Sequence, residues 1–199
     1  MRSTRSLLVA FAALGATATP ATAGGSIGAR VDVLPLGRLQ HRETGFDSRT
    51  EPLGTTVGFA GRITYEPLPN LSIGAVPRFV LELTPDVETG GDSGSQLDLL
   101  ALLELHGEVS PGLRVAAFGT IGYSRLGFGE PAQGIALGVG AGVERDIGAG
   151  TFARVELGYQ HASHESRDVR GGSGIPSMEI TVSNTTRLLH IGLGVGRRF

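Results

Sequence analysis

Residues 187–199 read RLLHIGLGVGRRF, and this ending decides the fold. From Leu189 to Val195 every second residue is apolar, and the residues between them are mostly glycine. A strand places successive side chains on opposite faces, whereas a helix would scatter these glycines around its circumference and be weakened by each one. The segment is therefore predicted to be a strand. One face carries Leu189, Ile191, Leu193, Val195 and Phe199, and the other carries His190, Gly192, Gly194, Gly196 and Arg198.

The same alternation of apolar and polar or small residues occurs in seven earlier segments. Together they predict an all-β chain of eight antiparallel strands that run up and down and close into a barrel. The predicted strands are Ile27–Val33, Val57–Tyr65, Leu71–Leu83, Leu97–Leu105, Leu113–Tyr123, Gly134–Asp146, Thr151–His161 and Arg187–Phe199.

The connections between these strands alternate in length. Tight turns rich in Pro, Asn and Gly follow the second, fourth and sixth strands, and longer polar stretches follow the others. Short turns on one side and long loops on the other are typical of a transmembrane β-barrel, with its turns in the periplasm and its loops outside the cell. The short turns are 67–70, 109–112 and 147–150, and the long loops are 36–54, 84–95, 125–133 and 162–186.

The first residues have the features of an export signal. Arg2 and Arg5 precede the apolar run LLVAFAAL, and small residues ending at Ala23 precede Gly24. Such a segment is a secretory signal peptide, and its apolar part is too short for a spanning helix. We predict cleavage between Ala23 and Gly24, which leaves 24–199 as one barrel domain.

The composition excludes two classes of protein. The chain has no Cys, so a disulfide framework is excluded despite the predicted export. Its net charge of −2 argues against a nucleic-acid partner. The five scattered His show no metal-ligand spacing, and we expect no metal or cofactor.

Periodicity alone does not say whether the apolar face points to lipid or, as in a soluble lipocalin-like barrel, to an internal core. The glycine-rich polar face suits the inside of a narrow barrel, where small residues make room for large ones. The strands are also long enough to cross a bilayer when tilted. Tyr65, Tyr123 and Tyr159 stand at strand ends on the apolar face, where interfacial girdles lie. The apolar face is therefore predicted to face lipid.

Pro77 interrupts this picture, because it lies in the middle of a predicted strand and cannot donate to a ladder. A closed barrel has no edge strand to hold it, so we expect either a bulge there or a local error in the predicted strand register.

The signal peptide, the eight alternating strands and the ending LGVGRRF resemble the small outer-membrane β-barrels grouped with the opacity proteins and the outer-membrane-protein A and X barrels. The resemblance implies a place in the bacterial outer membrane. It also implies that Phe199 is part of an assembly signal read by the barrel-assembly machinery, after escort by periplasmic chaperones. Arg197 stands at the third-last position, where some members carry an aromatic residue.

Charged residues collect on the face predicted to point inward. Eight strands enclose a space that side chains just fill, and buried charges there must pair. We interpret the set as a balanced network that plugs the interior; an ion or proton pathway is the alternative. The set comprises Arg30, Asp32, Arg62, Arg78, Glu82, Asp98, Glu104, Arg114, Glu144, Arg154, Glu156 and Arg198.

One cluster resembles a catalytic site. His161 and Ser163 share the predicted lipid-facing side, and the spacing resembles the His-x-Ser of lipid A deacylase barrels. Nucleophilic catalysis needs Ser beside His, with a carboxylate that orients the imidazole. The cluster also includes His164 and Glu165. His164 stands where that family has Asn after the Ser, and Glu179 lies farther downstream than the family's Glu.

The hypothesis we favour is a non-enzymatic barrel that serves envelope structure and surface interaction through its extracellular loops. The expected partners are outer-membrane lipid and lipopolysaccharide, with a host or matrix ligand at the loops. A lipid A acyl hydrolase and a narrow small-solute or ion channel are the alternatives.

Overall fold

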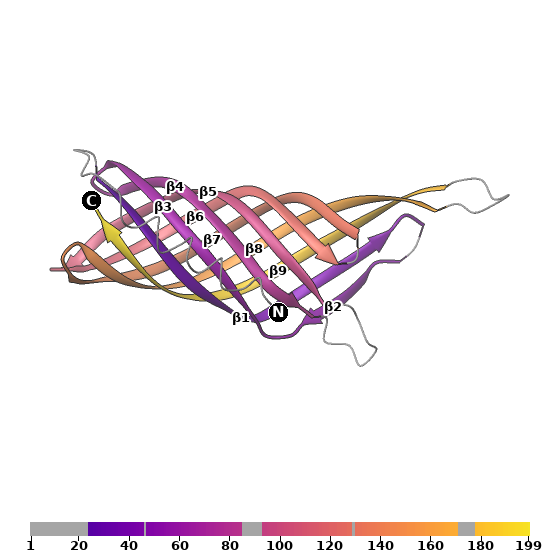
Figure 1. Cartoon of the computed structure of the whole chain (residues 1–199), viewed down its shortest axis with the longest axis horizontal. Coiled ribbons are helices and arrows are strands. Elements are labelled where there is room, and N and C mark those ends of the chain that lie inside the picture. Colours follow the sequence, from indigo (N-terminus) through magenta and orange to yellow (C-terminus); the bar gives the residue numbers. More distant parts are fainter. Residues whose placement is uncertain (1–23, 46, 85–92, 129, 171–177) are drawn as a thin grey trace, which may run out of the picture.

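The computed structural model describes residues 24–45, 47–84, 93–128, 130–170 and 178–199 (Figure 1). The predicted signal peptide, 1–23, lies outside the described residues. No helix long and apolar enough to cross a membrane occurs in the described part of the chain.

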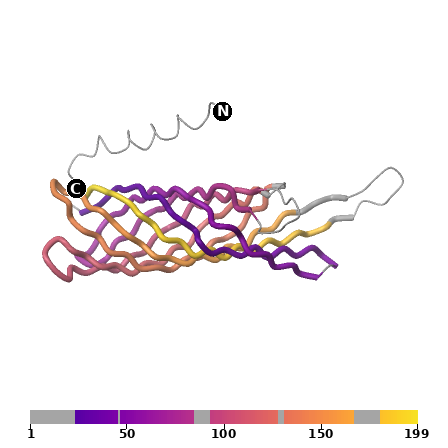
Figure 2. The backbone as a smooth tube through the Cα atoms, turned by 90° about the horizontal axis from the view of Figure 1, so that it is seen from below, coloured from indigo at the N-terminus to yellow at the C-terminus, as the bar shows by residue number. Residues whose placement is uncertain are grey.

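In the described part of the chain nine antiparallel strands form one sheet, and the pairing of β1 with β9 closes it into a ring. From β3 to β9, each strand pairs with the next strand in the sequence. β1 pairs with β3 and with β9, and β2 is paired with β1 alone among the described strands, so it lies outside the ring. The ring therefore holds eight strands, as predicted, and the closed barrel is seen in Figures 1 and 2. The strands are β1 (Gly25–Glu43), β2 (Arg49–Leu53), β3 (Thr56–Leu68), β4 (Leu71–Leu83), β5 (Gly94–Ser110), β6 (Leu113–Phe128), β7 (Glu130–Gly148), β8 (Thr151–Arg170) and β9 (Met178–Arg198).

The ninth strand, β2, lies within the region 36–54 that we expected to be a loop. After a register shift between Val33 and Leu36, β1 continues to Glu43 and pairs with both β9 and β2. β8 and β9 likewise continue through most of the loop expected at 162–186. These extensions project beyond the ring at the end opposite the short turns (Figure 2). The strands therefore extend farther into these two loop regions than the sequence predicted.

The distribution of side chains confirms the predicted orientation of the two faces. Leu193 on the outer face is 60% exposed, whereas Asp32 and Arg78 on the inner face are 0% and 2% exposed. Apolar side chains thus surround the ring, and charged, neutral polar and apolar side chains fill it. This inversion of the usual soluble core is what a barrel in a bilayer requires.

Pro77 is accommodated without a bulge of its own. It pairs with Leu99 of β5, while the ladder between β3 and β4 is interrupted between the pairs Ala60–Arg78 and Ile63–Ala75. Proline lacks the N–H that the ladder needs, so pairing is lost locally and the register is kept. The register shift of β4 lies instead between Val80 and Leu83. The bulge expected at Pro77 was therefore misplaced.

Candidate functional site

Arg154 is the centre of an ion-pair network in the half of the barrel nearer the short turns. Its guanidinium Nη1 lies 2.5 Å from Glu144 Oε1, Nη2 lies 2.5 Å from Glu104 Oε2, and Nε lies 2.5 Å from Glu156 Oε2. All four side chains are buried. One guanidinium, with donors in a planar fork, thus joins carboxylates from β5, β7 and β8.

Two further arginines extend this network across the lumen. Arg62 of β3 lies 2.5 Å from Glu104 and 3.4 Å from Glu156. Arg30 of β1 lies 2.7 Å from Asp32 and also pairs with Glu156. Each buried carboxylate therefore has at least one arginine partner, as charges away from water require.

The network reaches the rim of the barrel at Arg198. Its Nη2 lies 2.6 Å from Glu144, its Nη1 pairs with Asp146, and the guanidinium stands 4.8 Å from the ring centroid of Phe152. The ion pairs are thus continuous from Asp32 to the end of the chain.

A second polar cluster lies farther toward the long extensions. Arg78 Nε and Nη2 donate to one oxygen of Asp98 at 3.0 and 2.8 Å. Asp98 also accepts from neutral side chains, and one of these, Ser124, lies 2.8 Å from His164 Nε2. The neutral donors to Asp98 are Gln96 at 2.9 Å, Ser124 at 2.6 Å and Gln160 at 3.1 Å.

Sequence reasoning missed these neutral members, because it searched the inner face for charge alone. Gln96, Ser124 and Gln160 occupy the same alternating inner positions as the charged residues, and this position was the signal that could have found them.

Two residues of the predicted network lie outside both clusters. Glu82 is exposed, because the register shift in β4 and its positive φ of 45° turn the side chain out of the alternation. Its assignment to the interior was wrong. Arg114 lies near the short turns, half-buried, 3.8 Å from Glu66 and apart from the larger cluster.

An apolar cluster lies beside the second polar cluster, in the half of the barrel nearer the long extensions. Its members come from β1, β2, β4, β6 and β9, and all are less than 9% exposed. They face the inside of the ring, in contrast to the lipid-facing residues. The cluster, called the apolar cap here, comprises Leu34, Leu39, Leu53, Val80, Leu83, Leu126 and Leu188.

Solved structures of two bacterial membrane-protein barrels resemble the fold of this chain. Neisserial surface protein A superposes with a TM-score of 0.55 at 10% sequence identity, over 88% of this chain and 97% of that chain. The outer membrane protein OprG of Pseudomonas aeruginosa gives a TM-score of 0.52 at 14% identity, over 89% of this chain and 96% of that chain. The chain has the fold of the small outer-membrane β-barrels. Its sequence matches no protein-family model and no curated protein.

The barrel separates the residues of the suspected catalytic cluster. His164 is fully buried inside beside Ser124, whereas Ser163 is exposed and His161 half-buried on the outer face. In the described part of the chain no hydrogen bond joins His161 to Ser163, and neither side chain pairs with a carboxylate. The described residues therefore place no carboxylate in contact with His161 or Ser163.

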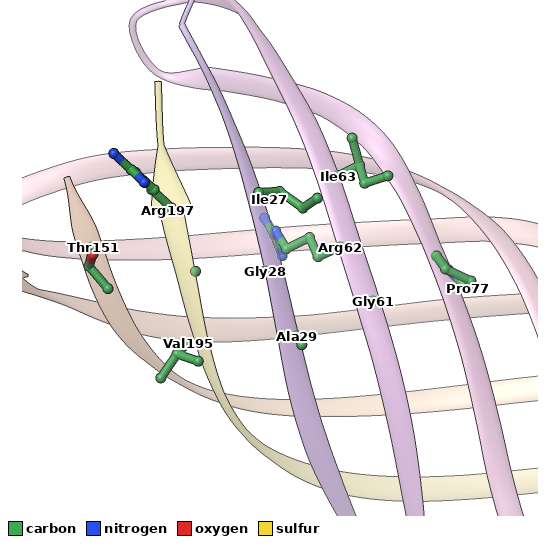
Figure 3. Close-up of a pocket in the computed structure, with 11 residues that line it drawn as sticks. Ile27, Gly28, Ala29, Gly61, Arg62, Ile63, Pro77, Thr151, Val195 and Arg197 are labelled. Atoms are coloured by element: carbon green, nitrogen blue, oxygen red, sulfur yellow. The ribbon is translucent and has the colours of Figure 1, made fainter. Parts of the chain in front are cut away.

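The barrel wall has a hollow where the β3–β4 ladder is interrupted (Figure 3). The hollow has a volume of about 400 Å³, and small residues such as Ala29 and Gly61 leave space between larger neighbours such as Ile63. Arg62 contributes to its lining, and its Nε is buried with no hydrogen-bond partner among the described residues. The lining is mostly apolar, as suits a surface that lies against lipid.

Proposed function

We propose that this protein is a bacterial outer-membrane barrel that is closed to solutes and serves envelope structure and surface contact through its extracellular extensions. The observation that carries the proposal is the filled lumen: an ion-pair network on one side and the apolar cap on the other. Eight strands leave only enough room for such side chains.

The ion-pair network and the apolar cap oppose the passage of solutes for different reasons. Moving the network aside would leave buried charges unpaired, which costs about 3–5 kcal/mol when one partner of a buried pair is lost. The apolar cap offers no partner to a hydrated ion that reaches it. These properties favour a structural plug over the ion or proton pathway.

The extensions supply the surface for contact. The outer part of β1 carries β2 and lies beside β9, and His41 Nδ1 of β1 stands 2.7 Å from Asn184 Oδ1 of β9. The extensions project beyond the ring (Figure 2), and most of their residues are polar. Lipopolysaccharide and a host or matrix ligand are the partners that we propose for this surface.

An epitope-insertion experiment tests the location and the topology. A short tag between Asp47 and Ser48, at the tip of the β1–β2 hairpin, should be labelled by antibody on intact cells. The same tag between Ser110 and Pro111, in a short turn, should be labelled only after the outer membrane is permeabilised. Equal labelling of both tags on intact cells, or recovery of the protein in another fraction, would contradict the proposal.

We infer that the chain is not a lipid A hydrolase, because His161 and Ser163 lack a carboxylate partner among the described residues. Overexpression of the wild-type chain should leave the mass of lipid A unchanged. A loss of acyl chains that disappears with Ser163→Ala would refute this inference.

A further inference from the structure

Three basic side chains stand next to one another on the outer face of the extended strands. Arg187 of β9 lies directly opposite Arg38 of β1 on one side and opposite His161 of β8 on the other. Opposing residues in an antiparallel pair have Cβ atoms about 5 Å apart. Arg38, Arg187 and His161, called the basic row here, therefore form one continuous oblique strip.

The described residues do not neutralise the basic row. None of its three side chains makes an ion pair or hydrogen bond with another residue that the structure describes. The nearest described carboxylate on the same face and strands is Glu165, which follows Ser163 along β8. Like charges directly opposite each other destabilise a sheet, and both arginines are exposed. An anion bound between them would remove this repulsion.

An apolar strip begins immediately below the basic row. The neighbouring row of the same three strands is Leu36, Leu189 and Tyr159, and Leu36 is 65% exposed. On β9 the outward residues from Leu189 to Val195 are all apolar, and Arg197 follows them. With about 3.3 Å per residue and a tilt of about 40°, the distance from Arg187 to Arg197 spans about 25 Å of depth. This equals the height of the apolar band of such barrels, so Arg187 lies at the extracellular boundary of the membrane.

We propose that the basic row binds the phosphate groups of lipid A, while the strip below it packs against the acyl chains. The proposal rests on the outer-membrane location proposed above. Guanidinium groups donate paired hydrogen bonds to phosphate oxygens, which are stronger than bonds between neutral groups. An amphiphile with phosphate at its polar end would place its phosphate against the basic row and its acyl chains against the apolar strip below, on β1, β8 and β9.

This assignment gives His161 a role other than catalysis. It would be one of three positioned donors to an anionic headgroup, and Ser163 in the next row would lie among polar neighbours at the same headgroup. A second copy of the chain is disfavoured as the occupant, because its own basic row would repel this one.

Binding to purified, folded, full-length mature protein in detergent micelles tests the proposal. The chain has no Cys, so a Ser110→Cys variant has one thiol, to which a single fluorophore is coupled. This thiol lies at a turn far from the basic row. Thermophoresis of the labelled protein is measured against diphosphoryl lipid A, dephosphorylated lipid A and inorganic phosphate. The test variant is Arg38→Gln with Arg187→Gln. The control is Arg125→Gln with Arg197→Gln, which removes the same charge elsewhere.

We expect the test variant to raise the Kd for diphosphoryl lipid A by about tenfold or more, because two charge-assisted contacts are lost. The control variant should bind as the wild type does, and dephosphorylated lipid A should bind all three proteins weakly and equally. Heat-modifiable migration shows that each variant is folded.

Three outcomes would overturn the proposal. Equal loss in the test and control variants would mean that binding reflects net charge alone, and no loss in the test variant would place the lipid elsewhere. Inorganic phosphate that binds as tightly as diphosphoryl lipid A would identify a free-anion site instead. Because the measurement uses purified protein, it can fail even if the epitope tags place the barrel in the outer membrane as proposed.

Discussion

Individual residues of the interior show what alternation predicts and what it leaves out. The alternation placed Arg154, Glu104 and Glu156 on the inner face, but it did not predict which carboxylate pairs with which arginine. That choice depends on the register between strands that are distant in sequence, such as β5 and β8. The error at Glu82 has a local cause, because a single positive φ at a register shift ends the alternation.

We expect Arg154→Met to destabilise the folded barrel by about 3–5 kcal/mol, because three carboxylates lose a shared partner in a buried place. The measurement is the urea midpoint for loss of the heat-modifiable band on gels. Arg49→Met is the matched control: its ion pair with Glu51 involves an exposed arginine. The control should shift stability by less than about 1 kcal/mol.

The pair Arg78–Asp98 allows a test of the second polar cluster. Asp98→Leu alone should destabilise the barrel strongly, since it leaves Arg78 buried without its carboxylate. Adding Arg78→Met should restore part of the loss, because no buried charge then remains at the pair. The same urea midpoints measure the effect, and additive losses in the double variant would contradict the account.

A glycine on the inner face serves as space for a larger side chain. A Cβ added at Gly158 would lie 2.4 Å from Cε1 of His190. Gly158→Val should therefore lower the urea midpoint, and His190→Ala in the same chain should recover part of it. Equal midpoints for Gly158→Val and the wild type would show that the interior has free room there.

At the scale of the strands, the sequence predicted the eight members of the ring but not their extensions. Pro35 and the many polar residues of 36–54 made this region resemble a loop. In the structure, however, successive side chains of β1 still alternate between two faces there, and Gly37, Leu39 and His41 share one face. The partner that stabilises this part of β1 is β9, which lies at the other end of the chain. Local composition carries little information on such long-range pairing.

The closing pair of strands gives a prediction for assembly. Phe199 and Gly25 exchange two backbone hydrogen bonds of 3.1 Å, beside the pairing of β1 with β9. Deleting Phe199 should lower the yield of heat-modifiable protein in the outer membrane while the signal peptide is still removed. Phe199→Tyr, which keeps an aromatic ring, should assemble as the wild type does. Normal yield from the deletion would show that the terminal residue is dispensable.

At the scale of the whole molecule, the barrel has its apolar surface outside and its charges inside. The sequence predicted this inversion from glycine content, strand length and the positions of tyrosines. It did not predict the apolar cap, because Leu34 and Leu188 interrupt the polar inner face at positions that only the closed ring brings together. The cap and the ion-pair network together make the lumen a filled interior.

Single-channel recording in planar bilayers shows whether the lumen is closed to ions. Folded protein, checked by heat-modifiable migration and inserted into the bilayer, should show no discrete conductance across a range of voltages of both signs. A large porin recorded in the same bilayers controls for the sensitivity of the measurement. Reproducible conductance steps from the wild-type chain would contradict the filled lumen.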